Sequence, residues 1–321
     1  MRRACAATAI AVAIACIASH AIARGPAKSD LSAVWTNSSL TELERPIGFK
    51  NLTLSDTEAA AYERRRPGEI FATEVDDVGG RQSESVGWDT ELKLTRIAGQ
   101  ARTSWLIDPA DGQLPYSAAG RAALAEGRAR AGGVAGPEDR SIAERCLLPG
   151  RGASGPPLLA NPYANLTQIV QTRDAVVIAL ENNHDVRIIR LGVTTHLPPT
   201  VRPWMGDTIG HWEGRTLVAE TTNFNPGEFF RAPTAPLISA QGKVTERFTR
   251  LSPTALHYEF EVDDPITYTQ VWRGEMMFLA TKGPLYEYAC HEGNYALGNI
   301  LAGARRQEAE TTASARLAKT H

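Results

Sequence analysis

The chain's densest group of side chains suited to proton transfer lies in a segment that reads YEYACHEGNY and begins at Tyr286. On a β-strand, alternate side chains share a face, so Glu287 and His291 would project to the same side. An imidazole titrates near neutral pH, and a carboxylate on the same face would let the two groups act together in proton transfer. We therefore predict that Glu287 and His291 are catalytic and that Tyr288 contacts a ligand.

The same segment also has a structural interpretation. It would join a strand to the last helix, with Glu292 and Asn294 capping that helix and Cys290 holding the junction through a disulfide. The sequence leaves both interpretations open.

His184 and Asp185 lie at a turn between two apolar segments. An aspartate that orients a histidine is part of a catalytic triad, so both side chains are catalytic candidates. The sequence has no Gly-x-Ser-x-Gly motif to supply a nucleophile, and turns favour Asn and Asp for backbone reasons alone. A purely structural turn is therefore the alternative.

A loop rich in aromatic residues and glycine, 202–214, precedes a predicted strand. Trp204 would offer a ligand an apolar surface, and Asp207 and His211 would offer it polar contacts. We predict that these three side chains line a ligand site and that Trp212 belongs to the core.

Inside the expected barrel described below, Tyr258, Tyr268 and Trp272 provide an aromatic lining. Glu220 is a charged residue in an otherwise apolar strand. Together these side chains would enclose an aromatic or terpenoid-like molecule, with Glu220 as an acid or base in apolar surroundings. A filled core is the alternative.

Metal, nucleotide and nucleic-acid binding are not predicted, and we expect no cofactor. The glycine-rich stretches lie in no strand–turn–helix context, and the histidines lie in no H-x-x-x-H or H-E-x-x-H spacing. With 34 basic and 36 acidic residues, the chain lacks the positive charge of a dedicated nucleic-acid binder. A metal site would need carboxylates to converge with one or more of four histidines: His184, His196, His211 and His291.

Short apolar segments that alternate with turn residues follow the Gly/Pro-rich stretch 150–157, a pattern typical of β-strands. Eight consecutive strands without helices between them predict an antiparallel meander. We expect the meander to close into an eight-stranded lipocalin-like barrel, because closure removes exposed edges. The predicted strands are 168–172, 175–181, 186–190, 215–222, 243–251, 255–262, 267–278 and 285–291.

The rest of the chain is predicted to surround this mainly β body. Residues 24–161 form an irregular N-terminal wrapping segment with a strand at 101–107 and short helices. One helix begins with a capping box of Ser55 and Glu58 and ends near Arg66, and another covers 117–131. Residues 162–310 form the barrel and a C-terminal helix, 295–310, that packs on it. A disordered tail, 311–321, follows.

Residues 1–23 have the positive start, apolar run and small-residue cleavage site of a secretory signal peptide. Its removal leaves Cys146 and Cys290 in an oxidising compartment, where one disulfide is the simplest expectation. The disulfide would close a loop of about 145 residues and stabilise the fold by about 4–5 kcal/mol in the chain-entropy model. Two free thiols are the alternative. We expect a periplasmic or secreted protein without stable membrane insertion.

Five segments carry a family resemblance: GPEDRSIAERC (136–146), NNHDVRIIRL (182–191), HLPPTVRPWMGDTIGHWEGRTLVAETTNF (196–224), VTERFTRLSPTALHYEFEVDDP (244–265) and GPLYEYACHEGNYALGNILAGAR (283–305). Together they resemble a family of exported, mostly uncharacterised proteins of soil and freshwater bacteria. The resemblance covers about Trp105 to Arg305 and implies export and a lipocalin-like β-barrel. It implies no catalytic residues.

These patterns predict an exported protein that binds a small apolar or aromatic molecule inside a β-barrel. Cofactor-independent lyase, isomerase or hydrolase chemistry on that molecule would use His291, Glu287 and His184 for proton transfer. The alternative is a non-catalytic envelope or interaction protein with a filled barrel.

Overall fold

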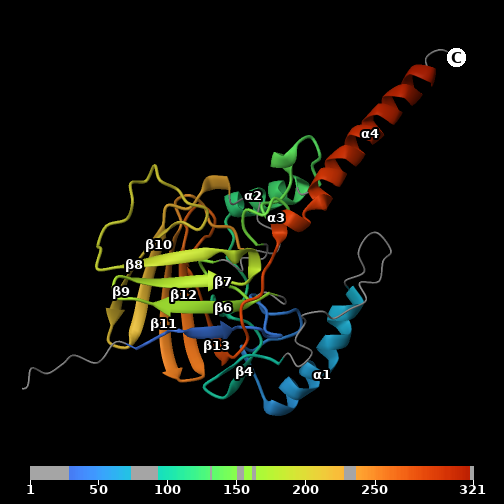
Figure 1. Ribbon diagram of the computed structural model, residues 1–321. Helices are drawn as coiled ribbons and strands as arrows, with labels where there is room; N and C mark the ends of the chain where they lie inside the picture. The colour runs from blue at the N-terminus through green and yellow to red at the C-terminus, as the bar shows by residue number, and fades with distance from the viewer. Residues whose placement is uncertain are drawn as a thin grey trace, which may run out of the picture.

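The computed structural model describes residues 29–73, 93–130, 132–149, 155–160, 164–227 and 236–318. The predicted signal peptide, 1–23, lies outside these residues. The main body is a closed β-barrel, with a small sheet and further helices beside it and one long C-terminal helix that projects away from it (Figure 1). Within the described ranges, no helix is long and apolar enough to cross a membrane.

Nine strands of the described chain form the ring of the barrel, and each is hydrogen-bonded to the next. The first strand pairs with both the second and the last, which closes the ring. Closure gives every ring strand a partner on both edges. In ring order the strands are β1 (Ala33–Thr36), β6 (Leu166–Gln171), β7 (Ala175–Leu180), β8 (Val186–Leu191), β9 (Asp207–Glu213), β10 (Thr216–Thr222), β11 (Lys243–Ser252), β12 (Ala255–Asp263) and β13 (Trp272–Thr281).

The prediction of an eight-stranded, purely antiparallel barrel was wrong in strand number and direction. The described part of the ring has nine strands, and β8 and β9 are parallel. β1 comes from the segment predicted only to wrap the barrel, where burial of Trp35 holds it in the ring. β9 comes from the loop predicted at 202–214. A tenth strand, β5 (Leu106–Asp108), pairs with β13 outside the ring.

The segment 285–291, predicted as the last strand, forms none. Because β1 occupies the free edge of β13, this segment has no place in the ring. It leads instead into the short helix α3 (Cys290–Gly293).

The parallel pair follows from the chain's path between β8 and β9. Parallel neighbours need a connection that returns to the starting end of the first strand. Residues 192–206 make that return, and we call them the crossover segment. The crossover segment therefore places both strands' first residues at the same end of the barrel.

The small sheet and the first two helices lie in the N-terminal part of the chain. The sheet contains β2 (Thr53–Leu54), β3 (Arg96–Ile97) and β4 (Gln100–Arg102), so the predicted strand 101–107 is divided between β4 and β5. α1 (Asp56–Thr73) and α2 (Ala118–Arg130) are the predicted helices.

The predicted capping box at the start of α1 is confirmed. Ser55 Oγ accepts the N–H of Glu58 at 3.3 Å, and the Glu58 carboxylate accepts the N–H of Ser55 at 2.9 Å. The predicted end near Arg66 is wrong, because the helix continues through Pro67 to Thr73.

The C-terminal helix differs from its prediction in length and packing. α4 (Tyr295–Ala318) continues beyond the predicted end at 310, so residues 311–318, predicted as a disordered tail, are helical. None of its residues is buried, and the helix projects away from the barrel rather than packing on it (Figure 1).

The barrel aromatics predicted to line a ligand cavity are packed together in the core. Tyr258, Tyr268 and Trp272 are at most 2 % exposed, and the ring centroids of Tyr268 and Trp272 lie 5.5 Å apart. The Tyr258 hydroxyl donates to Glu246 at 2.8 Å, and that of Tyr268 donates to the carbonyl of Leu237 at 2.8 Å. These rings and their polar ends are therefore buried and hydrogen-bonded within the core.

Cys146 and Cys290 form the predicted disulfide, with an S–S distance of 2.04 Å and a sequence separation of 144 residues. It joins the segment after α2 to the first residue of α3. The bond therefore fixes the base of α4 to a distant part of the chain.

Candidate functional site

A pocket of about 500 Å³ opens between the first residues of β8 and the start of β9. We call it the β8/β9 pocket. Its walls are mainly apolar, with a few charged groups among them. The apolar lining residues are Leu147, Leu148, Val186, Ile188, Leu197, Pro203, Trp204 and Met205, and the charged ones are Asp185, Arg187, Arg190 and Asp207.

The parallel pair creates this pocket. β8 and β9 are paired at only three positions, from Ile189 opposite Thr208 to Leu191 opposite Gly210. Before these positions β8 and the segment that leads into β9 are not paired. Side chains, rather than backbone hydrogen bonds, line the space between them. The pocket lies at this unpaired end, where the crossover segment returns to the barrel.

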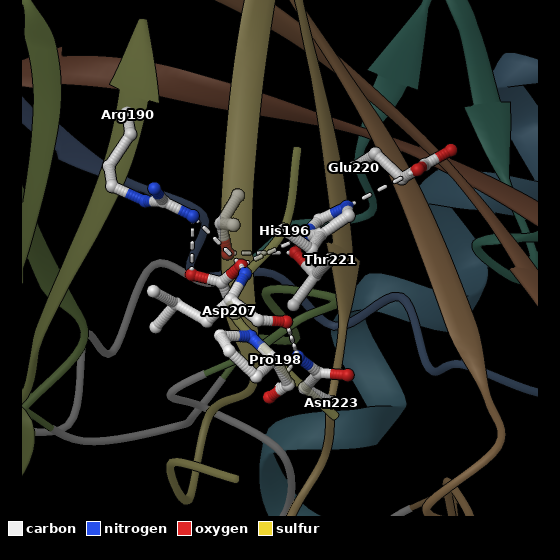
Figure 2. Close-up of polar contacts among 9 residues, drawn as sticks. Arg190, His196, Pro198, Asp207, Glu220, Thr221 and Asn223 are labelled. Carbon is white, nitrogen blue, oxygen red and sulfur yellow. Dashed lines mark hydrogen bonds and ion pairs between the residues drawn. The ribbon is translucent and has the colours of Figure 1, made fainter. Parts of the chain in front are cut away.

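Asp207, the first residue of β9, is the centre of the polar contacts beside the pocket (Figure 2). Its two carboxylate oxygens accept from Nη2 of Arg190 at 2.8 and 2.9 Å. One oxygen also accepts the N–H of Leu197 and lies against Nδ1 of His196, each at 2.9 Å. A single buried carboxylate thus ties β8 and the crossover segment to β9.

The backbone around Asp207 is shaped to allow these contacts. Gly206 has a φ of +71°, and a Cβ there would lie 2.6 Å from the carbonyl oxygen of Thr222, so only glycine fits. On the other side, the side-chain amide of Asn223 donates to the carbonyl of Leu197 at 2.8 Å (Figure 2). The crossover segment is therefore clamped from both sides where His196 meets the barrel.

Burial of Asp207 alone would raise the pKa of its carboxyl. The amide of Leu197, the His196 ring and the Arg190 guanidinium oppose that effect, and together they hold the pKa of Asp207 below its ordinary value. Asp207 is therefore a fixed anion at neutral pH.

His196 lies between two carboxylates on the outer face of the barrel. Its Nε2 is 3.3 Å from Glu220, which also lies 3.6 Å from Nζ of Lys243. Because Asp207 faces the other ring nitrogen, the imidazole can donate to both carboxylates only in its cationic form. His196 therefore joins a buried carboxylate to an exposed one.

The position of Glu220 corrects the prediction that it lies inside the barrel. It pairs across β9 and β10 with Ile209 on the outer face, and its side chain is 42 % exposed. The expectation of a carboxyl in apolar surroundings was therefore wrong.

A second charged group stands behind the pocket, inside the barrel. Arg187 donates to Glu246 through Nη1 at 3.0 Å and also through Nη2. Both side chains are almost completely buried, and the Nε of Arg187 is buried without a hydrogen-bond partner among the described atoms. Arg187 is also among the residues that line the β8/β9 pocket, but its guanidinium points to Glu246 inside the barrel.

Three of the predicted site residues meet at this pocket: Trp204, Asp207 and Asp185. His211, predicted to line the same site, lies further along β9, where its side chain is 67 % exposed and its Nε2 is 3.2 Å from Glu213.

The predicted catalytic residues near the C-terminus lie elsewhere. Glu287 and Tyr288 line a second pocket of about 510 Å³ at the base of α4, together with Cys290. His184 contacts this segment, since its Nε2 accepts the N–H of Tyr288 at 3.2 Å. His291 is exposed on α3, so the strand face predicted to bring Glu287 and His291 together does not exist.

Arg190 and His196 are the residues of this site that the sequence did not single out. Arg190 is one of several charged residues on a predicted strand, and the sequence suggests His196 only as one of several histidines that could bind a metal. Their role depends on the crossover segment, whose path no local pattern in the sequence indicates.

No protein-family model matches the chain, and a comparison with curated proteins finds no similar sequence. Among the residues that the structure describes, no group of three or more His, Cys, Asp or Glu side chains is arranged to hold a metal ion. The function is therefore argued from the β8/β9 pocket itself.

Asp207→Asn is expected to lower the free energy of unfolding by about 2–3 kcal/mol at pH 7, because it removes charge-assisted hydrogen bonds from a buried site. Since the folded state lowers the pKa of Asp207, its stabilisation is present above the unfolded value of 3.8 and is lost as the pH falls through the folded value. Urea unfolding at pH 7 and pH 3 should therefore show a stability difference from the wild type that shrinks in acid.

Glu213→Gln is the matched control for this experiment. Glu213 also contacts a histidine and an arginine, but on the exposed surface, so its loss should matter much less. An Asp207→Asn protein as stable as the wild type at pH 7, or a difference that persists at pH 3, would contradict the assignment.

Proposed function

We propose that this protein is an exported binding protein whose β8/β9 pocket holds a small, mainly apolar molecule. The observation that carries the proposal is the pocket itself. Its volume of about 500 Å³ lies within the range of about 300–1,000 Å³ that is usual for ligand sites. A mainly apolar wall with a few convergent polar groups is also the usual composition of such sites.

Exposed apolar side chains at the pocket support this proposal. Val186 is 48 % exposed and Ile188 is 56 % exposed, although both project from a strand of the barrel. A bound apolar molecule would remove part of this surface from water, which is favourable by about 25 cal/mol per Å². Trp204 adds a broad aromatic surface to the lining.

The geometry supports binding better than acid–base catalysis. The Asp207 carboxylate is already engaged by Arg190, His196 and Leu197, and its lowered pKa makes it a weak base. Both nitrogens of His196 face carboxylates rather than the pocket. These groups hold the pocket in shape.

The disulfide supports the export part of the proposal. Bonds such as Cys146–Cys290 form and persist mainly in oxidising compartments, such as the bacterial periplasm or the extracellular space.

Trp204→Ala is expected to weaken retention of the natural ligand about 30-fold, because it removes the largest apolar contact surface of the pocket. Native mass spectrometry of protein purified from its own host would compare the wild type with this variant. The wild type should carry a small molecule that the variant has lost.

Tyr295→Ala is the control, since Tyr295 is 77 % exposed on α4 and does not line this pocket. It should retain the ligand, and circular dichroism should show that both variants are folded. A wild-type protein without any bound small molecule, or equal retention by Trp204→Ala, would contradict the proposal.

A further inference from the structure

We infer that the ligand of the β8/β9 pocket is an uncharged carbonyl compound, such as a ketone, ester or lactone on an apolar skeleton. This inference rests on the proposed binding function. The reason is the balance of hydrogen-bond donors and acceptors that remain unpaired after the polar groups of the pocket have bonded to one another.

The pocket has free hydrogen-bond donors. Arg190 uses only Nη2 to bind Asp207, and its Nε and Nη1 have no hydrogen-bond partner within the described chain. The Arg190 side chain is 33 % exposed, so a ligand can reach it. A ligand oxygen that accepts from these N–H groups would keep them hydrogen-bonded when the ligand displaces water from the pocket.

The two carboxylates of the pocket, in contrast, already have partners. The Asp207 oxygens accept from Arg190 and Leu197 and contact His196. Asp185 has an interaction partner of its own. The described side chains of the pocket therefore offer free donors, whereas their carboxylates already have partners. A carbonyl oxygen accepts from such donors and brings no donor of its own that would need a partner.

Charge balance separates a carbonyl from a carboxylate. Both arginines of the lining already have a carboxylate partner, Glu246 for Arg187 and Asp207 for Arg190. Asp185 adds a further negative charge to the lining. The site therefore has no excess positive charge to offset a ligand anion, and burial of an unpaired carboxylate costs far more than burial of a hydrogen-bonded carbonyl.

Four probes with one bicyclic skeleton test this inference: tetralin, β-tetralone, β-tetralol and tetralin carboxylate. Calorimetry should show that the wild type binds the ketone about tenfold more tightly than the hydrocarbon, the alcohol or the carboxylate. Arg190→Lys keeps the positive charge beside Asp207 but removes the Nε and Nη1 donors. It should reduce the preference for the ketone to about twofold or less.

Arg173→Lys is the matched control, because Arg173 is 90 % exposed, pairs with Asp174 and does not line the pocket. It should leave the tenfold preference intact. Trp204→Ala should weaken all the complexes that form.

The outcomes separate the two proposals. Equal binding of tetralin and β-tetralone, or tightest binding of the carboxylate or the alcohol, would overturn the carbonyl inference and still support apolar binding. A ketone preference that survives Arg190→Lys would also overturn it. Binding of no member of the series, together with no retained molecule in host-purified protein, would contradict the proposed function itself.

Discussion

Glu246→Ala is expected to be the most destabilising single substitution considered, with a loss of about 3–5 kcal/mol in the free energy of unfolding. Glu246 is fully buried inside the barrel, where it accepts from Arg187 and from the Tyr258 hydroxyl. Its removal leaves the Arg187 guanidinium buried without a counter-charge. It also removes a link between β8, β11 and β12, because the three residues come from these strands.

A double variant shows whether the lost stability comes from the uncompensated charge of Arg187 or from lost packing. The double variant Arg187→Met, Glu246→Leu replaces both charges with apolar side chains of similar volume. It should recover most of the stability, because buried ion pairs replaced in this way are often neutral or better. Urea unfolding at pH 7 measures all three proteins.

The exposed pair of Arg247 and Glu213 provides a surface control. Arg247→Ala should change stability much less than Glu246→Ala, since water solvates the charges that remain. A Glu246→Ala protein within about 1 kcal/mol of the wild type would contradict the assigned role, because breaking a buried ion pair normally costs several times more.

Removal of the disulfide is the second change with a large expected effect. The double variant Cys146→Ser, Cys290→Ser should lose about 4–5 kcal/mol in the free energy of unfolding, because the bond spans 144 residues and restricts the unfolded chain. The same change frees the base of α4. It also frees the segment containing Leu147 and Leu148, which line the β8/β9 pocket.

The reducing agent dithiothreitol provides the matched comparison for this variant. Reduced wild type should unfold at the same urea concentration as the double serine variant, and the variant should not respond to the reagent. A double variant as stable as the oxidised wild type would show that the bond contributes little, whatever its loop length.

The barrel strands that depend on local pattern could be predicted from the sequence. In β12, inward-facing Leu256, Tyr258 and Phe260 alternate with half-buried side chains, and turn residues bound the strand on both sides. The same is true of β7 and β11. The Ser55–Glu58 capping box was also visible, because its residues are three positions apart and interact through the helix that they start.

The candidate site could be predicted only in part. Trp204 and Asp207 are predictable because residues of their kinds, in a loop rich in glycine, suit ligand contacts. Arg190 and His196 were missed because their partner, Asp207, reaches them only through the parallel pairing of β8 and β9. Glu220 was misplaced because an apolar strand does not reveal which of its faces points inward when one face is covered by another segment.

By itself, the sequence determined the elements whose causes lie within a few residues: alternating strands, turns, a capped helix and an even pair of cysteines. Tertiary structure decided how these elements were used. Burial of Trp35 brought β1 into the ring and left the segment 285–291 without a strand partner. The return of the crossover segment made β8 and β9 parallel and opened the β8/β9 pocket. The physical reason is that strand pairing and charge burial join residues that are distant in the chain. The free energy of such contacts depends on the whole fold and not on the local sequence.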